Sequence, residues 1–272
     1  MAGEQITTRG ELRRSVAQLL GDLVELTATH NSGDTATFRD VNRLGLQIES
    51  PKHGDIIFTS GDNAGPIRRI TEADLSTGTI MFPSLTAATE AGDTAEIHNL
   101  RAKGWPVYEK HSAINQAINA SWPAYKEPIT VPLTDLFSLT EPVLSVPEDM
   151  THVVGVQYQT SDGDWIDLPS IYWSLDRGLA EITVSGYAFR SRLDGLPIRL
   201  VGGARPEPLT SDDDTTTVRP DFITYQAAAF LCQRRYNQLH EAEFYNQQIL
   251  NQQYADRYKP RSRGTGVAVR TA

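Results

Sequence analysis

The sequence predicts an α+β protein in which two antiparallel β modules alternate with helices. Two blocks of the chain consist of short runs rich in Val, Ile and Thr, divided at intervals of about 8–12 residues by turns containing Gly, Asp and Pro, as in antiparallel sheets. Around these blocks, apolar residues recur three and four positions apart, which indicates amphipathic helices. The expected order is an N-terminal helix, a small antiparallel β-barrel or sandwich, a middle helix, a second β-sandwich-like module, and a long C-terminal helix with an extended basic tail.

A capping box predicts where the first helix begins. Thr8 is followed three residues later by Glu11, the spacing at which each side chain caps the other residue's backbone N–H. Leu12 and Val16 then follow at helical spacing. We therefore expect an N-terminal helix within residues 1–23.

The two β modules are expected over 24–104 and 128–204, with the middle helix between them in the segment 105–127. Within the second module, the pair Asp162-Gly163 is a strong signal for a hairpin turn. The helical stripe of the middle segment consists of Tyr108, His111, Ile114, Ala117, Ile118 and Trp122.

The C-terminal part of the chain begins with an acidic segment, 205–219, rich in Pro and Asp, which we expect to be a solvated linker. Pro220 suits a first helical turn, and the apolar stripe that follows predicts one continuous helix over 220–258. Residues 259–272 form a basic tail whose Val-Ala-Val run could add a strand to the edge of a neighbour's sheet. The stripe starts with Phe222, Tyr225, Ala229, Cys232 and Tyr236.

Composition excludes several classes of protein. The chain has 272 residues, with 25 Lys+Arg against 34 Asp+Glu and a net charge of −9. No run approaches the ~20 apolar residues of a membrane span, and the N-terminus lacks the apolar core of a secretory signal, so we expect synthesis in the cytoplasm. Cys232 is the only cysteine, which excludes a disulfide within one chain, and its place on the apolar stripe predicts a buried thiol.

Catalytic motifs are missing from the sequence. There is no phosphate-binding loop, dinucleotide fingerprint or nucleophile elbow. His240-Glu241 starts like a zinc-protease motif, but Phe244 stands where the second histidine would be. The acidic groups around Gly163 and at 212–214 lack the spacing of a calcium loop, so we interpret them as a hairpin turn and a linker. We expect no enzyme activity and no catalytic, cofactor-binding or metal-binding residues.

The layout resembles that of virion neck and head-to-tail connector (adaptor) proteins of tailed bacteriophages. The resemblance rests on the N-terminal helix, the run FTSGDNAGPIRRIT from Phe58 to Thr71, and the strand after AGDT at 91–94. It continues through the helix at 111–122 and the helix from Phe222 to Tyr258 with its basic tail. The resemblance implies a structural protein that forms a ring of about twelve copies between the portal and the tail or a further neck protein. DNA would pass through that ring without sequence-specific binding, and the protein would be located in the virion.

The resemblance also implies where partners bind. We expect the C-terminal helix and tail to contact the portal or a neighbouring subunit, because aromatic and basic side chains concentrate interface energy. For the aromatic residues, packing within their own subunit is the alternative. A turn near Asp62 is a candidate ring-contact loop, with a purely structural turn as the alternative. The C-terminal contact residues are Tyr236, Phe244, Tyr245, Tyr254, Lys259, Arg261, Arg263 and Arg270, and those of the loop are Asp62, Asn63, Arg68 and Arg69.

Two other functions remain open from the sequence. One is a tail-completion or baseplate component, which would share the β-rich layout but bind tail proteins. The other is a carbohydrate-binding virion module, because sugars stack on exposed aromatic rings and four tryptophans lie in or near the β blocks. These are Trp105, Trp122, Trp165 and Trp173.

Overall fold

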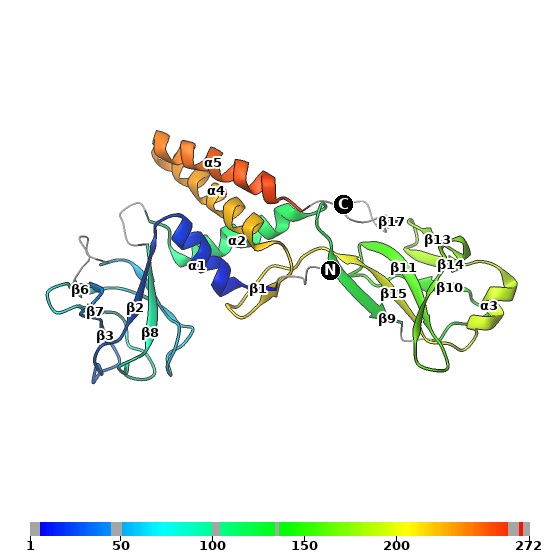
Figure 1. The fold of residues 1–272 in the computed structure, drawn as a ribbon, viewed down its shortest axis with the longest axis horizontal. Coiled ribbons are helices and arrows are strands. Elements are labelled where there is room, and N and C mark those ends of the chain that lie inside the picture. The colour runs from blue at the N-terminus through cyan, green and yellow to red at the C-terminus, as the bar shows by residue number, and fades with distance from the viewer. Residues whose placement is uncertain (1–5, 45–50, 100–103, 134–135, 261–266, 269–272) are drawn as a thin grey trace. The chain divides into compact units, whose positions relative to one another are not determined.

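The structure is a computed structural model that describes residues 6–44, 51–99, 104–133, 136–260 and 267–268. The chain divides into two compact units, one formed by 1–118 with 208–259 and the other by 119–207 with 260–272. The described residues form a mixed α+β protein with several antiparallel sheets, which confirms the expected fold class (Figure 1). Each of the two β blocks has its own sheets and its own apolar core.

The first unit begins with a short strand, β1 (Thr7–Thr8), and helix α1 (Arg9–Leu19). The predicted capping box is present, because the Thr8 side chain accepts a hydrogen bond from the Glu11 N–H and the Glu11 carboxylate accepts one from the Thr8 N–H. Leu12, Val16 and Ala17 form the buried side of this helix. The N-terminal helix is therefore confirmed, and it ends a few residues before Asp22.

Two antiparallel sheets make up the first β module. The first has the order β2-β8-β4-β5, and the second has the order β3-β7-β6. Among the described residues neither sheet closes into a barrel, so the barrel form of the prediction is not confirmed. The strands are β2 (Leu23–Thr27), β3 (Thr37–Arg39), β4 (Asp55–Phe58), β5 (Ile67–Arg69), β6 (Glu72–Asp74), β7 (Thr79–Met81) and β8 (Thr94–His98).

Side chains from both of these sheets share one core. The rings of Phe38, Phe58 and Phe82 pack edge to face, with centroids 6.0 and 5.4 Å apart, an arrangement that aromatic quadrupoles favour. Ile56, Ile80 and other aliphatic side chains surround them. Ile67, which lies at the outer strand of its sheet, is exposed, whereas Ile70 is buried.

Helix α2 (Val107–Ser121) has the predicted position, and its last three residues already belong to the second unit. There, β12-β11-β15-β9 form one sheet, with β17 also paired to β11, and β10-β14-β13 form another. A short helix, α3 (Tyr187–Leu193), and a 3₁₀ turn, η2 (Ser170–Tyr172), were not expected from the sequence. The strands are β9 (Glu127–Pro132), β10 (Val143–Ser145), β11 (His152–Gln159), β12 (Trp165–Leu168), β13 (Trp173–Asp176), β14 (Glu181–Val184), β15 (Ile198–Ala204) and β17 (Val267–Ala268).

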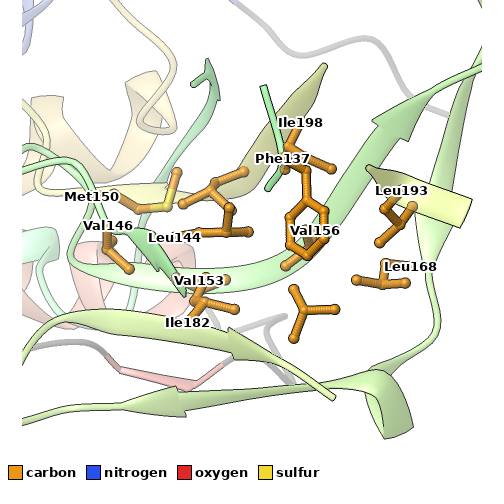
Figure 2. Close-up of a cluster of buried hydrophobic side chains, with 12 residues drawn as sticks. Phe137, Leu144, Val146, Met150, Val153, Val156, Leu168, Ile182, Leu193 and Ile198 are labelled. Atoms are coloured by element: carbon orange, nitrogen blue, oxygen red, sulfur yellow. The ribbon is translucent and has the colours of Figure 1, made fainter. Parts of the chain in front are cut away.

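The core of the second unit lies between its two sheets. Figure 2 shows Val153 and Val156 of β11 together with Leu144 of β10, Ile182 of β14 and Leu193 of α3. The Asp162-Gly163 turn joins β11 to β12, with Gly163 at a φ of 88°, so the predicted hairpin is confirmed.

The prediction of one continuous C-terminal helix is wrong. The structure has two helices, α4 (Pro220–Leu239) and α5 (Ala242–Tyr258), packed against each other in opposite directions (Figure 1). The helix ends because His240 adopts a left-handed conformation with a φ of 55°, and its N–H donates to the Tyr236 carbonyl. The apolar spacing continues through this break, so the spacing alone could not reveal it.

Candidate partner-binding surfaces and a buried ionic network

The aromatic residues predicted as anchors divide into buried and exposed positions. Phe244 is buried, and its ring packs edge-on against Trp105 with centroids 5.9 Å apart. Tyr236 is half-buried and lies 5.2 Å from Tyr245, measured between ring centroids. Tyr245 is 46 % exposed, so of these three rings it offers the most surface to a partner.

Tyr254, the fourth predicted anchor, belongs to a stack of tyrosine rings. Tyr225 of α4 stacks between Tyr254 and Tyr258 of α5, with centroid distances of 5.0 and 5.7 Å. The Arg219 guanidinium lies over the Tyr258 ring at 4.6 Å, and Arg257 lies 5.2 Å from the Tyr254 ring. Such cation–π contacts stabilise the stack, which fastens the end of α5 to the start of α4.

Several exposed apolar side chains lie on the α4–α5 pair. Tyr245, Ile249 and Leu250 all point away from the buried side of α5, which carries Phe244, and Leu239 at the end of α4 is exposed as well. We call these four residues, Leu239, Tyr245, Ile249 and Leu250, the α5 apolar patch. Single exposed apolar residues are common on protein surfaces, but a group on one helical hairpin suggests a contact surface.

The basic tail is described only in part. Lys259 is exposed at the end of α5, while Arg261, Arg263 and Arg270 lie outside the described residues. Further on, Val267 and Ala268 form β17, which pairs with Val153 and His152 of β11 in the same chain. The strand that the sequence suggested for a neighbour's sheet is thus paired within its own subunit.

The candidate ring-contact loop has one inward-facing residue. The Asn63 side chain is buried, where it donates to the Ala87 carbonyl at 3.0 Å and accepts from the Ala87 N–H at 3.2 Å. This pairing holds the turn and fits the structural alternative for Asn63. Asp62 is exposed beside it, Arg68 is half-buried, and Arg69 donates to the Asp55 carboxylate at 2.8 Å.

A buried ionic network, which the sequence did not predict, connects α1 to the first sheet. Arg13 donates to Glu96 at 3.2 Å, and both side chains are nearly inaccessible. Arg14, on the rim, donates to the other Glu96 oxygen. Burial raises the pKa of the Glu96 carboxyl, but the hydrogen bond from His98 and the charges of the two arginines outweigh it and lower the pKa to about 2.

The network continues through His98 to Lys110 of α2. The imidazole Nε2 lies 3.1 Å from Glu96, and Nδ1 lies 3.1 Å from the Lys110 Nζ. Because an ammonium only donates and a carboxylate only accepts, Nε2 carries the proton and Nδ1 accepts. Burial lowers the pKa of His98 to about 4, aided by the positive charge of Lys110. Lys110 donates to the Asp22 carboxylate at 2.7 Å.

The prediction that the acidic segment 205–219 is a solvated linker is wrong for Asp212. This carboxylate pairs with Arg13 and, at 3.1 Å, with Arg9, and the backbone around it bonds to the start of α1. Burial raises the Asp212 pKa, but the Arg13 charge outweighs it and the pKa is lowered. Next to it, β16 (Thr215–Thr216) pairs with β1. The run of aspartates therefore ties the acidic segment to the start of α1.

The sequence held only a weak signal for this network. Residues 94–98, TAEIH, alternate polar and apolar side chains, a pattern typical of a strand with one face in water. In the structure, Ala95 and Ile97 face the apolar core, while Glu96 and His98 face Arg13 and Lys110. The alternation alone did not show that this polar face is covered by Arg13 and Lys110 and not by water.

An open groove lies between α1 and the start of α4. It has a volume of about 650 Å³, and its lining mixes charged residues, such as Glu11, Arg14 and Asp221, with Leu19 and Tyr225. The lining contains no arrangement of nucleophile, base and orienting group. Within the described ranges, no group of three or more His, Cys, Asp or Glu residues is placed to hold a metal ion.

Cysteine and tryptophan side chains occupy mostly interior positions. Cys232 is buried, as predicted, and burial raises the pKa of its thiol to about 12. Trp105 is buried, and Trp173 packs on the core of the second unit. The Trp165 ring is covered by Arg199 at 4.3 Å, and Trp122 is half-buried. None of the described helices is long and apolar enough to span a membrane.

Comparison of the sequence with protein-family models and curated proteins yields no relative. No protein-family model matches the chain, and no curated protein matches it. Function must therefore be argued from the surfaces and contacts described above.

Proposed function

We propose that this chain is a structural subunit of a ring in the neck of a tailed phage, joining the portal to the tail and lining the DNA conduit. The observation that supports this proposal most is the α5 apolar patch. It lies on the helical hairpin where the sequence predicted contacts, and it includes Tyr245, one of the predicted anchors. A subunit whose remaining apolar surface is covered by its neighbours in a ring would carry such a patch.

The charge of the chain supports the same role. A net charge of −9 gives a wall that repels DNA phosphates, so DNA would slide past it rather than bind. The ionic network adds a second argument, because it ties α1, which packs against α4, to the first sheet and to the acidic segment. A helical hairpin held in one orientation lowers the entropic cost of assembly.

The mass of the particle tests this proposal. The purified protein is measured alone and mixed with a candidate portal, by native mass spectrometry and light scattering. We expect a monomer alone and a closed ring with the portal. A chain that ignores the portal at high concentration overturns the proposal, and a chain that instead binds tail proteins in pull-downs supports a tail-completion or baseplate role.

Two variants locate the contact. Ile249→Asp places a charge in the α5 apolar patch and should abolish ring formation. Leu179→Asp is the matched control, because Leu179 is also an exposed aliphatic residue but lies outside the patch. A chain shortened to end at Tyr258 tests the tail. If Ile249→Asp and the shortened chain both assemble like the original protein, neither the patch nor the tail forms the interface.

A further inference from the structure

Lys110 and Asp22 form a buried ion pair whose amine and carboxyl groups can also react with each other. The Lys110 Nζ lies 2.7 Å from the Asp22 Oδ2, with the lysine side chain 0 % and the aspartate side chain 4 % exposed. The amine and the carboxyl group are thus in direct contact, which supplies the proximity that a condensation between them needs. The pair therefore brings a nucleophile and an electrophile together away from water.

The same site holds a base for the lysine. The His98 Nδ1 faces the Lys110 Nζ at 3.1 Å, and the imidazole is oriented by its Nε2–H bond to Glu96 at 3.1 Å. Nucleophile, base and orienting carboxylate in a row are the parts of a catalytic triad. Glu96 is kept ionised by Arg13 and Arg14, and its hydrogen bond to His98 opposes the lowering of the His98 pKa by burial.

The surroundings favour the neutral amine of Lys110 and retain the product. Burial lowers the pKa of Lys110, although the Asp22 charge opposes this shift. The backbone N–H of Trp105 donates to the Asp22 Oδ2 at 3.1 Å and would support negative charge on that oxygen during attack. Water has little access to the site, so hydrolysis of an amide formed there would be slow.

We propose that the folded chain joins Lys110 to Asp22 by an amide bond that it forms itself. Nothing else in the molecule is consumed, and the inference does not depend on the proposed ring.

The reaction balances without a co-reactant. The Lys110 ammonium passes one proton directly to the Asp22 carboxylate along their 2.7 Å hydrogen bond, which leaves a neutral amine and a carboxylic acid. The amine lone pair attacks the Asp22 carboxyl carbon, and a C–N bond forms. The nitrogen loses a second proton through His98 to the departing hydroxyl, and the C–O bond breaks with loss of water. Three ammonium hydrogens thus become one on the amide nitrogen and two in water.

Such a bond would fasten two distant parts of the first unit. Asp22 directly precedes β2 and Lys110 lies in α2, 88 residues away. Closing a loop of this length restricts the unfolded chain, as a disulfide does. The chain has only one cysteine and so cannot form a disulfide within itself.

The mass of the denatured wild-type protein tests the proposal directly, without any variant. We expect a mass about 18 Da below that calculated from the sequence, because one water is lost. Succinimide formation at Asp162-Gly163 or Asp194-Gly195 also removes one water, so the loss must be located by trypsin digestion. Trypsin cannot cleave after an amidated lysine, so we expect a branched peptide joining residues 15–39 to residues 104–126.

An unshifted mass, or an unbranched pair of peptides cleaved after Lys110, overturns the proposal and leaves an ion pair only. Lys110→Arg keeps the charge and should show neither the mass loss nor the branched peptide. Lys126→Arg is the matched control, because Lys126 also donates to a histidine, His152, but pairs with no carboxylate among the described residues; it should keep the branched peptide. In His98→Gln, the branched peptide should form at least tenfold more slowly, and an unchanged rate would overturn the role of His98 as the base.

Discussion

The Arg13 guanidinium donates to the Glu96 carboxylate at 3.2 Å, and both side chains are almost completely buried. Removing one member of a buried ion pair leaves the other charge without compensation. We therefore expect Glu96→Ala to lower the free energy of unfolding by about 3 kcal/mol or more, measured by urea denaturation. Glu25→Ala is the control, because Glu25 is exposed and lies 3.7 Å from Arg14. It should change stability by about 0.5 kcal/mol at most, and an equal loss in both variants would contradict the argument.

Burial of His98 predicts a loss of stability in mild acid. Its pKa is about 4 in the folded chain, against 6.5 for an unperturbed histidine. Between these values the unfolded chain binds a proton that the folded chain does not, so stability is complete above pH 6.5 and falls as the pH drops toward 4. The loss from this one group is about 3 kcal/mol.

Urea denaturation at several pH values measures this dependence. His98→Gln should flatten the slope between pH 6.5 and 4, although its stability at neutral pH is lower. His30→Gln is the control, since His30 is exposed and bonds only to neighbouring Thr29. If both variants keep the wild-type slope, His98 is not the source of the acid sensitivity.

The sequence predicted those features of the fold that residues close together in the chain determine. The Thr8 capping box, the middle helix and the Asp162-Gly163 hairpin are set by neighbouring residues, and the structure contains all three. The network around Glu96 and Lys110 is set by contacts between residues far apart in sequence, so alternation along one strand could not reveal it. Phe244, one of the predicted contact residues, lies in a helix as predicted. The apolar spacing did not show whether its side chain packs within the subunit or faces a partner.

The break at His240 yields a prediction about backbone strain. A residue other than glycine in the left-handed conformation carries a steric cost that glycine does not. His240→Gly should therefore raise the free energy of unfolding by about 0.5–1 kcal/mol, as measured by urea denaturation. Leu239→Gly, one position earlier and within α4, should instead lower it by about 1 kcal/mol. A loss of stability in His240→Gly would show that the histidine side chain contributes more than its backbone costs.

Phe244 and Tyr245 are neighbours in sequence, yet truncating them should lower stability to very different extents. Phe244 is buried against Trp105, so Phe244→Ala should lower the free energy of unfolding by about 3–5 kcal/mol. Tyr245 is 46 % exposed, so Tyr245→Ala should cost about 1 kcal/mol or less in the isolated subunit. If the α5 apolar patch binds a neighbour, Tyr245→Ala should nevertheless weaken assembly about tenfold or more, measured as the concentration at which rings form. If Tyr245→Ala assembles like the wild-type protein, Tyr245 is not part of the interface. The contact would then have to lie elsewhere on the subunit.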